Sequence, residues 1–161
     1  KFITMWKRKT LLEKRKDPDP VFMNVSFVGP DRLAILLDKY GHGSVVTQVV
    51  PPFDTTGTNY PAVTEYLAAM RKYYPMTKPN FVGLEGYLAT NIFVEALKRA
   101  GKNPTREGFI DTVESIKDLD IQAGNKISFS KENHQGSQTV YPTVIRGGKF
   151  YPIDDWTKIR Q

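Results

Sequence analysis

The side chains that could carry out chemistry in this sequence are few and scattered. The chain has no cysteine, which excludes disulfides, thiolate catalysis and cysteine-ligated metals. Its two histidines, His42 and His134, stand far apart in polar contexts that are typical of loops, so we expect no metal site. Neither histidine lies in a nucleophile motif, and the acidic residues show no spacing that marks a catalytic carboxylate pair. We therefore predict no catalytic residues, no metal and no cofactor.

Residues 83–86 (GLEG) look like part of a glycine-rich phosphate loop. The stretch lacks the complete G-x-G-x-x-G or G-x-x-x-x-G-K pattern that nucleotide binding requires. We interpret these glycines as positions where a helix packs closely against a neighbour.

The end of a predicted strand is the better candidate for a binding site. Residues 21–27 are predicted to form a short buried strand, and Gly29-Pro30 then leads into a helix. In open α/β sheets, ligands lie beyond the carboxyl ends of the strands. The hydroxyl of Ser26 and the ring of Phe27 could offer a polar group and a hydrophobic wall to a small solute. A strand-to-helix turn without function would show the same pattern, so the residues alone leave both interpretations open.

The charge of the chain is unevenly distributed. The formal net charge is +6, and residues 1–16 carry seven basic side chains against one acidic side chain, so residues 17–161 are neutral. A basic chain can indicate nucleic-acid binding. Here the excess is confined to one predicted helix, which favours a solvated helical face, with an acidic partner as the alternative.

The elements that must position these residues alternate between helix and strand. Hydrophobic residues make up 40% of the chain and no apolar run approaches the roughly 18 residues of a membrane span, so a globular fold is expected. Apolar spacing predicts helices, and β-branched clusters bounded by glycine or proline predict strands. The predicted helices are 2–16, Pro30 to about Gly41, 60–74, 81–100 ending at Gly101, and one capped by Thr105; the predicted strands are 21–27, 44–50, 126–130, 138–145 and 149–153. This order favours the α/β class.

Five stretches taken together are more specific than any single motif. They are FMNVSFVGPDRLAILL (22–37), GSVVTQVVPPFD (43–54), PNFVGLEGYLATNIFVEALKRAG (79–101), PTREGFIDTVESIK (104–117) and ISFSKENHQGSQTVYPTVIRGGKF (127–150). In this order and spacing they resemble the type I periplasmic-binding protein family, in its branched-chain amino acid (Leu/Ile/Val) branch, over about residues 21–153.

The resemblance implies a fold of two Rossmann-like α/β lobes joined by hinge crossings, of which this chain matches only the C-terminal part. We therefore expect an incomplete periplasmic-binding-protein type I fold. The implied organisation is an atypical basic helix at 1–20, part of the second lobe at 21–50, part of the first lobe at 51–138, and a hairpin returning to the second lobe at 139–161.

The resemblance also implies a function. It is that of the extracytoplasmic solute-binding component of an ABC importer for branched-chain amino acids or related small molecules, located in the periplasm or outside the cell. The implied partners are a small-molecule solute, a membrane permease, and either the missing N-terminal half or a second copy; nucleic acid is not expected. The alternatives are an extracellular ligand-sensing receptor domain and a small α/β enzyme.

Carried over by position, Ser26 falls where the strand end of the family's second lobe contacts the solute, with Phe27 beside it. In branches that bind amino acids, an acidic side chain can occupy this region and hold the ligand ammonium. Serine disfavours a standard amino acid and allows an aromatic acid, an amide or another neutral-ended solute. Glu85, near a helix start close to the expected hinge, is a weaker candidate for a polar contact.

Overall fold

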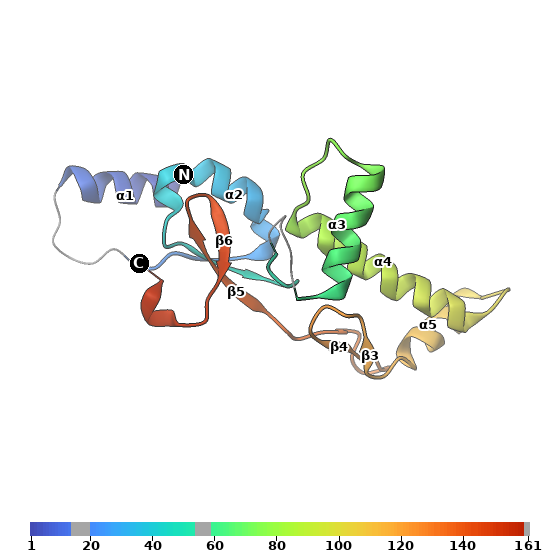
Figure 1. The fold of residues 1–161 in the computed structure, drawn as a ribbon. Helices are drawn as coiled ribbons and strands as arrows, with labels where there is room; N and C mark the ends of the chain where they lie inside the picture. Colours follow the sequence, from blue (N-terminus) through green and yellow to red (C-terminus); the bar gives the residue numbers. More distant parts are fainter. Residues whose placement is uncertain (14–19, 54–58, 160–161) are drawn as a thin grey trace. The chain divides into compact units, whose positions relative to one another are not determined.

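The computed structural model describes residues 1–13, 20–53 and 59–159 (Figure 1). The chain divides into two compact units, one formed by Lys1–Pro52 with Val140–Gln161 and the other by Phe53–Thr139. The assignment of residue ranges to two lobes of a larger protein stays a prediction.

The first unit is built on a four-stranded sheet in the order β1-β2-β5-β6. Strand β1 runs parallel to β2, and the other two pairings are antiparallel. Gly147 and Gly148 join β5 to β6 with φ angles of 54° and 74°, which a tight hairpin turn requires and glycine adopts without strain. The strands are β1 (Met23–Val25), β2 (Val45–Gln48), β5 (Tyr141–Arg146) and β6 (Lys149–Pro152).

Each face of this sheet carries a small apolar core. Helix α2 (Pro30–Leu37) lies over one face, where Ala34 and Leu37 pack with Val46 and Ile145 (Figure 1). Helix α1 (Phe2–Leu12) adds Ile3 to this cluster. On the other face, β2 and β5 pack against the segment that follows the short 3₁₀ turn η3 (Trp156–Lys158).

The second unit is mainly helical. Its elements are α3 (Pro61–Tyr73), α4 (Phe81–Ala100), α5 (Arg106–Glu114) and a two-stranded ladder of β3 (Leu119–Asp120) with β4 (Lys126–Ile127). The carboxamide oxygen of Asn80 caps α4 by accepting from the Gly83 amide at 2.8 Å. The Thr105 hydroxyl caps α5 by accepting from the Gly108 amide at 3.0 Å, which confirms the predicted cap.

A close approach between α3 and α4 explains one of the two glycines at 83–86. The Tyr66 hydroxyl of α3 lies against Gly83, where an added Cβ would come within 2.5 Å of the phenolic oxygen. The packing interpretation is therefore confirmed for Gly83. It is wrong for Gly86, because no described atom lies within 4 Å of the corresponding position.

A helix is found at each predicted place, whereas several strands are shorter than predicted. The helix predicted from Pro30 to about Gly41 is α-helical only to Leu37 and is followed by a 3₁₀ helix over Asp38–Gly41. The basic helix expected within 1–20 is α1, which ends at Leu12, and residues 14–19 lie outside the described residues. The strand predicted at 21–27 is β1 alone, because the Gly29 amide donates to the Ser26 carbonyl and turns the chain into a 3₁₀ helix. The strand predicted at 126–130 ends after Ile127, since the next amides donate to carbonyls outside the β3–β4 ladder.

Candidate functional site

The carboxyl ends of the neighbouring strands β1 and β2 lie side by side, at the same end of the sheet. The two strands are parallel and Val25 pairs with Thr47, so Ser26 and Gln48 follow at the same level. The two predicted site residues, Ser26 and Phe27, lie together in the 3₁₀ turn η1 (Ser26–Val28), which contacts both β2 and α2.

The turn presents the Phe27 ring to solvent. The Gly29 amide donates to the Ser26 carbonyl at 3.1 Å, and Gly29 has φ 72°, a left-handed conformation that favours glycine. Phe27 is 90% exposed, whereas Ser26 is half-buried beside it. Burying a phenylalanine ring contributes about 1.5–3 kcal/mol of free energy. A molecule that bound at the strand end and covered this ring would gain that much from apolar contact.

Gln48 is a further candidate for the site, and the sequence reasoning missed it. Its side chain is fully buried, and its side-chain nitrogen Nε2 lies 3.5 Å from the Thr143 hydroxyl oxygen. That hydroxyl in turn donates to the Val46 carbonyl at 2.7 Å. In the described part of the chain, the Gln48 Oε1 atom has no hydrogen-bond partner. An unsatisfied buried carbonyl costs about 1–3 kcal/mol, so a donor that reached it would be favoured.

Two further polar side chains flank this strand end. Asn24 pairs with Val46, so it shares the sheet face of Gln48, and its buried Nδ2 atom lacks a partner among the described residues. Asp31 lies in the first turn of α2, half-buried, and immediately follows the Gly29-Pro30 link to η1. The strand end therefore combines an exposed ring, neutral polar groups and a carboxylate on the adjoining helix.

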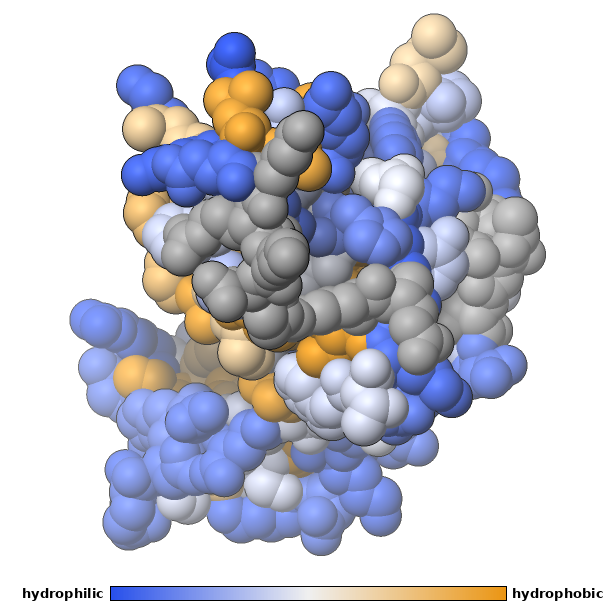
Figure 2. Space-filling view, turned by 90° about the vertical axis from the view of Figure 1, so that its left-hand side faces the viewer, coloured by the Kyte–Doolittle hydropathy of each residue, from blue (hydrophilic) through white to orange (hydrophobic). Residues whose placement is uncertain are grey.

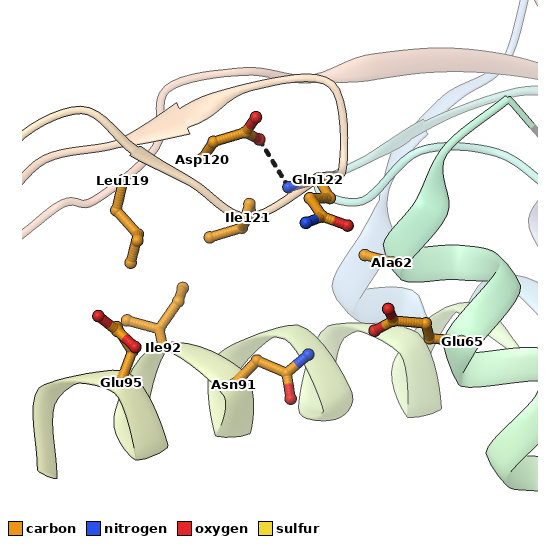
Figure 3. Close-up of a pocket in the computed structure, with 9 residues that line it drawn as sticks. All are labelled: Ala62, Glu65, Asn91, Ile92, Glu95, Leu119, Asp120, Ile121 and Gln122. Atoms are coloured by element: carbon orange, nitrogen blue, oxygen red, sulfur yellow. Dashed lines mark hydrogen bonds between the residues drawn. The ribbon is translucent and has the colours of Figure 1, made fainter. Parts of the chain in front are cut away.

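The second unit contains a hollow of about 180 Å³, formed by α3, α4 and the loop after β3 (Figure 3). Its acidic groups already have partners: Asp120 accepts from the Gln122 amide at 2.7 Å, and Glu95 accepts from Arg99 at 2.9 Å. The Glu65 carboxylate lies 3.4 Å from the Tyr87 hydroxyl. The lining residues are Ala62, Glu65, Asn91, Ile92, Glu95, Leu119, Asp120, Ile121 and Gln122.

A second hollow of about 430 Å³ lies in the same unit and is lined by Tyr60, Gly124 and Lys126 among others. Glu85, the weaker candidate, is exposed on α4 and lines neither hollow. Within the described ranges, no group of three or more His, Asp or Glu side chains is arranged to hold a metal ion. No helix in those ranges is long and apolar enough to cross a membrane.

Comparison with known proteins identifies the family. A search of functionally curated proteins gave no match. The sequence profile of the family described as "periplasmic binding protein" matches residues 18–149, which is most of the chain.

Solved structures agree with this match. A possible leucine/isoleucine/valine-binding protein from Rhodopirellula baltica superposes with a TM-score of 0.82 and 30% identity, over 98% of this chain and 41% of that one. A branched-chain amino acid ABC transporter protein from Thermus thermophilus with bound valine gives 0.70 and 22%, over 94% and 41%. A fatty acid ABC transporter substrate-binding protein from Thermomonospora curvata gives 0.71 and 21%, over 94% and 39%.

The chain thus spans about two-fifths of the length of these solved relatives. The architecture is the α/β periplasmic-binding-protein type I fold that the sequence predicted, represented in part. On the profile match and the superpositions together, the chain belongs to the periplasmic binding protein family.

Proposed function

We propose that this chain supplies one wall of the solute site in an extracytoplasmic binding protein, which serves an ABC importer of branched-chain amino acids or related small molecules. The observation that carries the proposal is the strand end itself, where the exposed Phe27 ring lies beside Ser26. The parallel strand pair that precedes it buries the Gln48 oxygen, which has no hydrogen-bond partner among the described residues. Family membership supports a role in binding rather than in catalysis.

The chemistry of this wall suits a small solute with an apolar body. The Phe27 ring offers hydrophobic contact, and Ser26 offers a hydroxyl that can donate or accept. Asp31 offers a negative charge for a solute that carries an ammonium group. Relatives of this fold are described as proteins for valine and for fatty acids, so the choice of solute rests on these side chains rather than on the fold.

The mechanism we propose is capture without covalent chemistry. The solute is held between this wall and the remainder of the binding protein, the parts close around it, and the closed form docks on a membrane permease in the periplasm or outside the cell. The ranges 21–50 and 139–161 then belong to one lobe and 51–138 to the other.

An NMR titration of the ¹⁵N-labelled chain tests the proposal, because it detects even millimolar binding by one wall of a site. The titrants are valine, leucine, benzoate and octanoate. We expect one of them to shift the signals of Ser26, Phe27 and Gln48 together. Phe27→Ala should weaken that binding about tenfold or more, as the loss of a buried ring predicts. Tyr151→Ala, a partly exposed aromatic of β6, is the matched control and should leave binding unchanged.

Asp31→Asn separates the solute classes. If the solute is an amino acid, this variant should weaken its binding, while binding of a carboxylate without an ammonium group should be unchanged or stronger. Shifts confined to the second unit, or no response to any titrant, would contradict the proposed site.

A further inference from the structure

The connection between α3 and α4 is exposed along its whole length. Every residue from 71 to 78 (RKYYPMTK) is exposed, from the last turn of α3 into the loop that precedes α4. Figure 1 shows this segment leaving the end of α3 and returning to the start of α4. Three of its side chains are large and apolar or aromatic: Tyr73 is 64% exposed, Tyr74 is 63% exposed and Met76 is 97% exposed. We call residues 71–78 the α3–α4 tip.

The α3–α4 tip joins apolar surface to positive charge. Hydrophobic residues reach the surface in other places too, as Figure 2 shows for one face of the molecule, and exposed apolar residues that stand singly are normal. In the tip they are gathered in one short segment with three cations, Arg71, Lys72 and Lys78. No acidic residue lies between Glu65 and Glu85, so these positive charges have no neighbouring anion in the sequence.

Hydrogen bonds hold the tip in one conformation. The Thr77 amide donates to the Tyr74 carbonyl at 2.9 Å and closes a turn within it. At its base, the Asn80 side chain donates to the Lys78 carbonyl at 3.3 Å, and the Tyr66 hydroxyl bonds to both the amide and the carbonyl of Asn80. Two prolines, one in the tip and one directly after it, restrict the backbone further. A partner that contacts the tip therefore orders little new structure, which favours binding.

We propose that the α3–α4 tip is a contact site for an anionic lipid surface. The two tyrosines and Met76 enter the layer between the headgroups and the acyl chains, where tyrosine is enriched in membrane proteins. The three cations lie among the headgroups, where each basic residue near an anionic surface strengthens binding roughly fivefold. Lys72 already lies over the Tyr73 ring, with its Nζ atom 4.9 Å from the ring centroid, so a cation and an aromatic ring are presented together.

The size of the tip favours a lipid surface over a protein partner. A stable protein–protein interface takes about 20–30 residues on each side, and the tip offers eight. An exposed loop also needs a complementary hollow in a protein, whereas lipid headgroups can rearrange around it. A soluble polyanion would engage the cations but would leave Met76 uncovered. The proposed solute wall lies in the first unit and shares no residue with the tip, so either proposal can fail without the other.

Co-sedimentation of the full chain with lipid vesicles tests the proposal. One set of vesicles is made of phosphatidylcholine, and the other contains equal parts of phosphatidylcholine and phosphatidylglycerol. We expect the chain to sediment with the anionic vesicles and to stay in solution with the neutral ones. Raising the salt concentration should release the bound chain, because salt screens the interaction between the cations and the headgroups.

A matched pair of double variants tests the role of charge in the tip. Arg71→Gln with Lys78→Gln removes two cations from the tip and should weaken binding to anionic vesicles about thirtyfold. Lys102→Gln with Arg106→Gln removes the same two residue types from exposed positions outside the tip and should leave binding nearly unchanged. Glutamine is used because it retains a helix propensity close to that of lysine and arginine.

The apolar contact is tested separately. Tyr74→Ser with Met76→Ser should weaken binding about tenfold or more while its salt dependence remains. The chain has no cysteine, so one introduced cysteine can carry a single environment-sensitive fluorophore. On Met76→Cys, the emission should shift to the blue when anionic vesicles are added. On Ile110→Cys, an exposed apolar position of α5, it should not shift.

Circular dichroism should show that all variants keep the fold. Three results would overturn the proposal. One is the absence of binding to anionic vesicles, and another is equal weakening by the two charge variants. The third is a fluorophore at position 76 that does not respond in the bound chain. If polyglutamate or RNA displaces the chain from the vesicles and the apolar double variant has no effect, the partner is a soluble polyanion and the proposal is wrong.

Discussion

Replacing Gly83 with alanine should destabilise the chain, whereas the same replacement at Gly86, three residues further along α4, should stabilise it. In a helix interior, alanine is favoured over glycine by about 0.5–1 kcal/mol, because glycine loses more backbone entropy on folding. At Gly86 no described atom lies within 4 Å of the added Cβ, so this gain is not offset. We expect Gly86→Ala to raise the free energy of unfolding by about 0.5–1 kcal/mol.

At Gly83 the added Cβ would lie 2.5 Å from the Tyr66 hydroxyl oxygen. Tyr66 cannot easily move, because it is only 3% exposed and its ring packs against Phe53 and Tyr87. Its hydroxyl also exchanges hydrogen bonds with the Asn80 amide and carbonyl, both at 3.2 Å. Losing two such hydrogen bonds costs about 1–3 kcal/mol, which exceeds the stabilisation that alanine provides over glycine in a helix. We therefore expect Gly83→Ala to lower the free energy of unfolding by about 1–2 kcal/mol.

Urea denaturation followed by circular dichroism measures both variants, and their free energies of unfolding should differ by about 1.5–3 kcal/mol. Tyr66→Phe provides the control, because it removes the oxygen and leaves Cζ as the nearest ring atom, at 3.4 Å. In that background, Gly83→Ala should cost less than it does in the unmodified chain. If Gly83→Ala stabilises the chain as much as Gly86→Ala does, the Tyr66 side chain yields freely and the packing argument is refuted.

Two further predictions concern the first unit. Leu37→Ala should lower its free energy of unfolding by about 2–5 kcal/mol, since Leu37 is 2% exposed in the core beneath α2; a cost below about 1 kcal/mol in urea denaturation would contradict this placement. Hydrogen bonds from the Thr157 hydroxyl and amide lower the pKa of Asp155 below its ordinary value of 3.8. The resulting stabilisation is complete above pH 3.8 and is lost as the pH falls through the lowered pKa. Thr157→Ala should raise this pKa towards 3.8 in an NMR titration, and an unchanged value would show that the hydroxyl bond does not contribute to lowering it.

The helices could be predicted from the sequence because their signals are local. The spacing of apolar residues along α3 and α4, and the caps at Thr105 and Gly101, depend on neighbours within a few positions. Strand ends depend on partners that are distant in the sequence. Ser128 bonds to Gly136, and Phe129 bonds to Ile116, so the alternating pattern after Lys126 extends beyond the ladder that β4 forms. The two-residue strand β3 has no comparable signal at all.

The candidate site was predictable where it depends on a strand followed by glycine and proline, as at Ser26 and Phe27. Gln48 was missed because a glutamine at the end of a valine-rich strand gives no sign of its burial, which comes from pairing β2 with both β1 and β5. The period-two alternation with Val46 was the available signal, since it places Gln48 on the sheet face that packs beneath α2.

The unfavourable features of the first unit lie close together in its sheet. Phe27 is 90% exposed, the Gln48 oxygen is buried without a partner in the described residues, and β1 presents two apolar side chains at an edge without protecting charge. Each feature costs free energy in the chain by itself, through unburied apolar surface or an unsatisfied polar group. All of them lie on β1 or at the carboxyl end of β1 and β2, while the opposite edge, at Lys149 and Pro152, carries the usual protection. These costs are therefore concentrated at β1 and at the strand end, which is where the proposed solute wall lies.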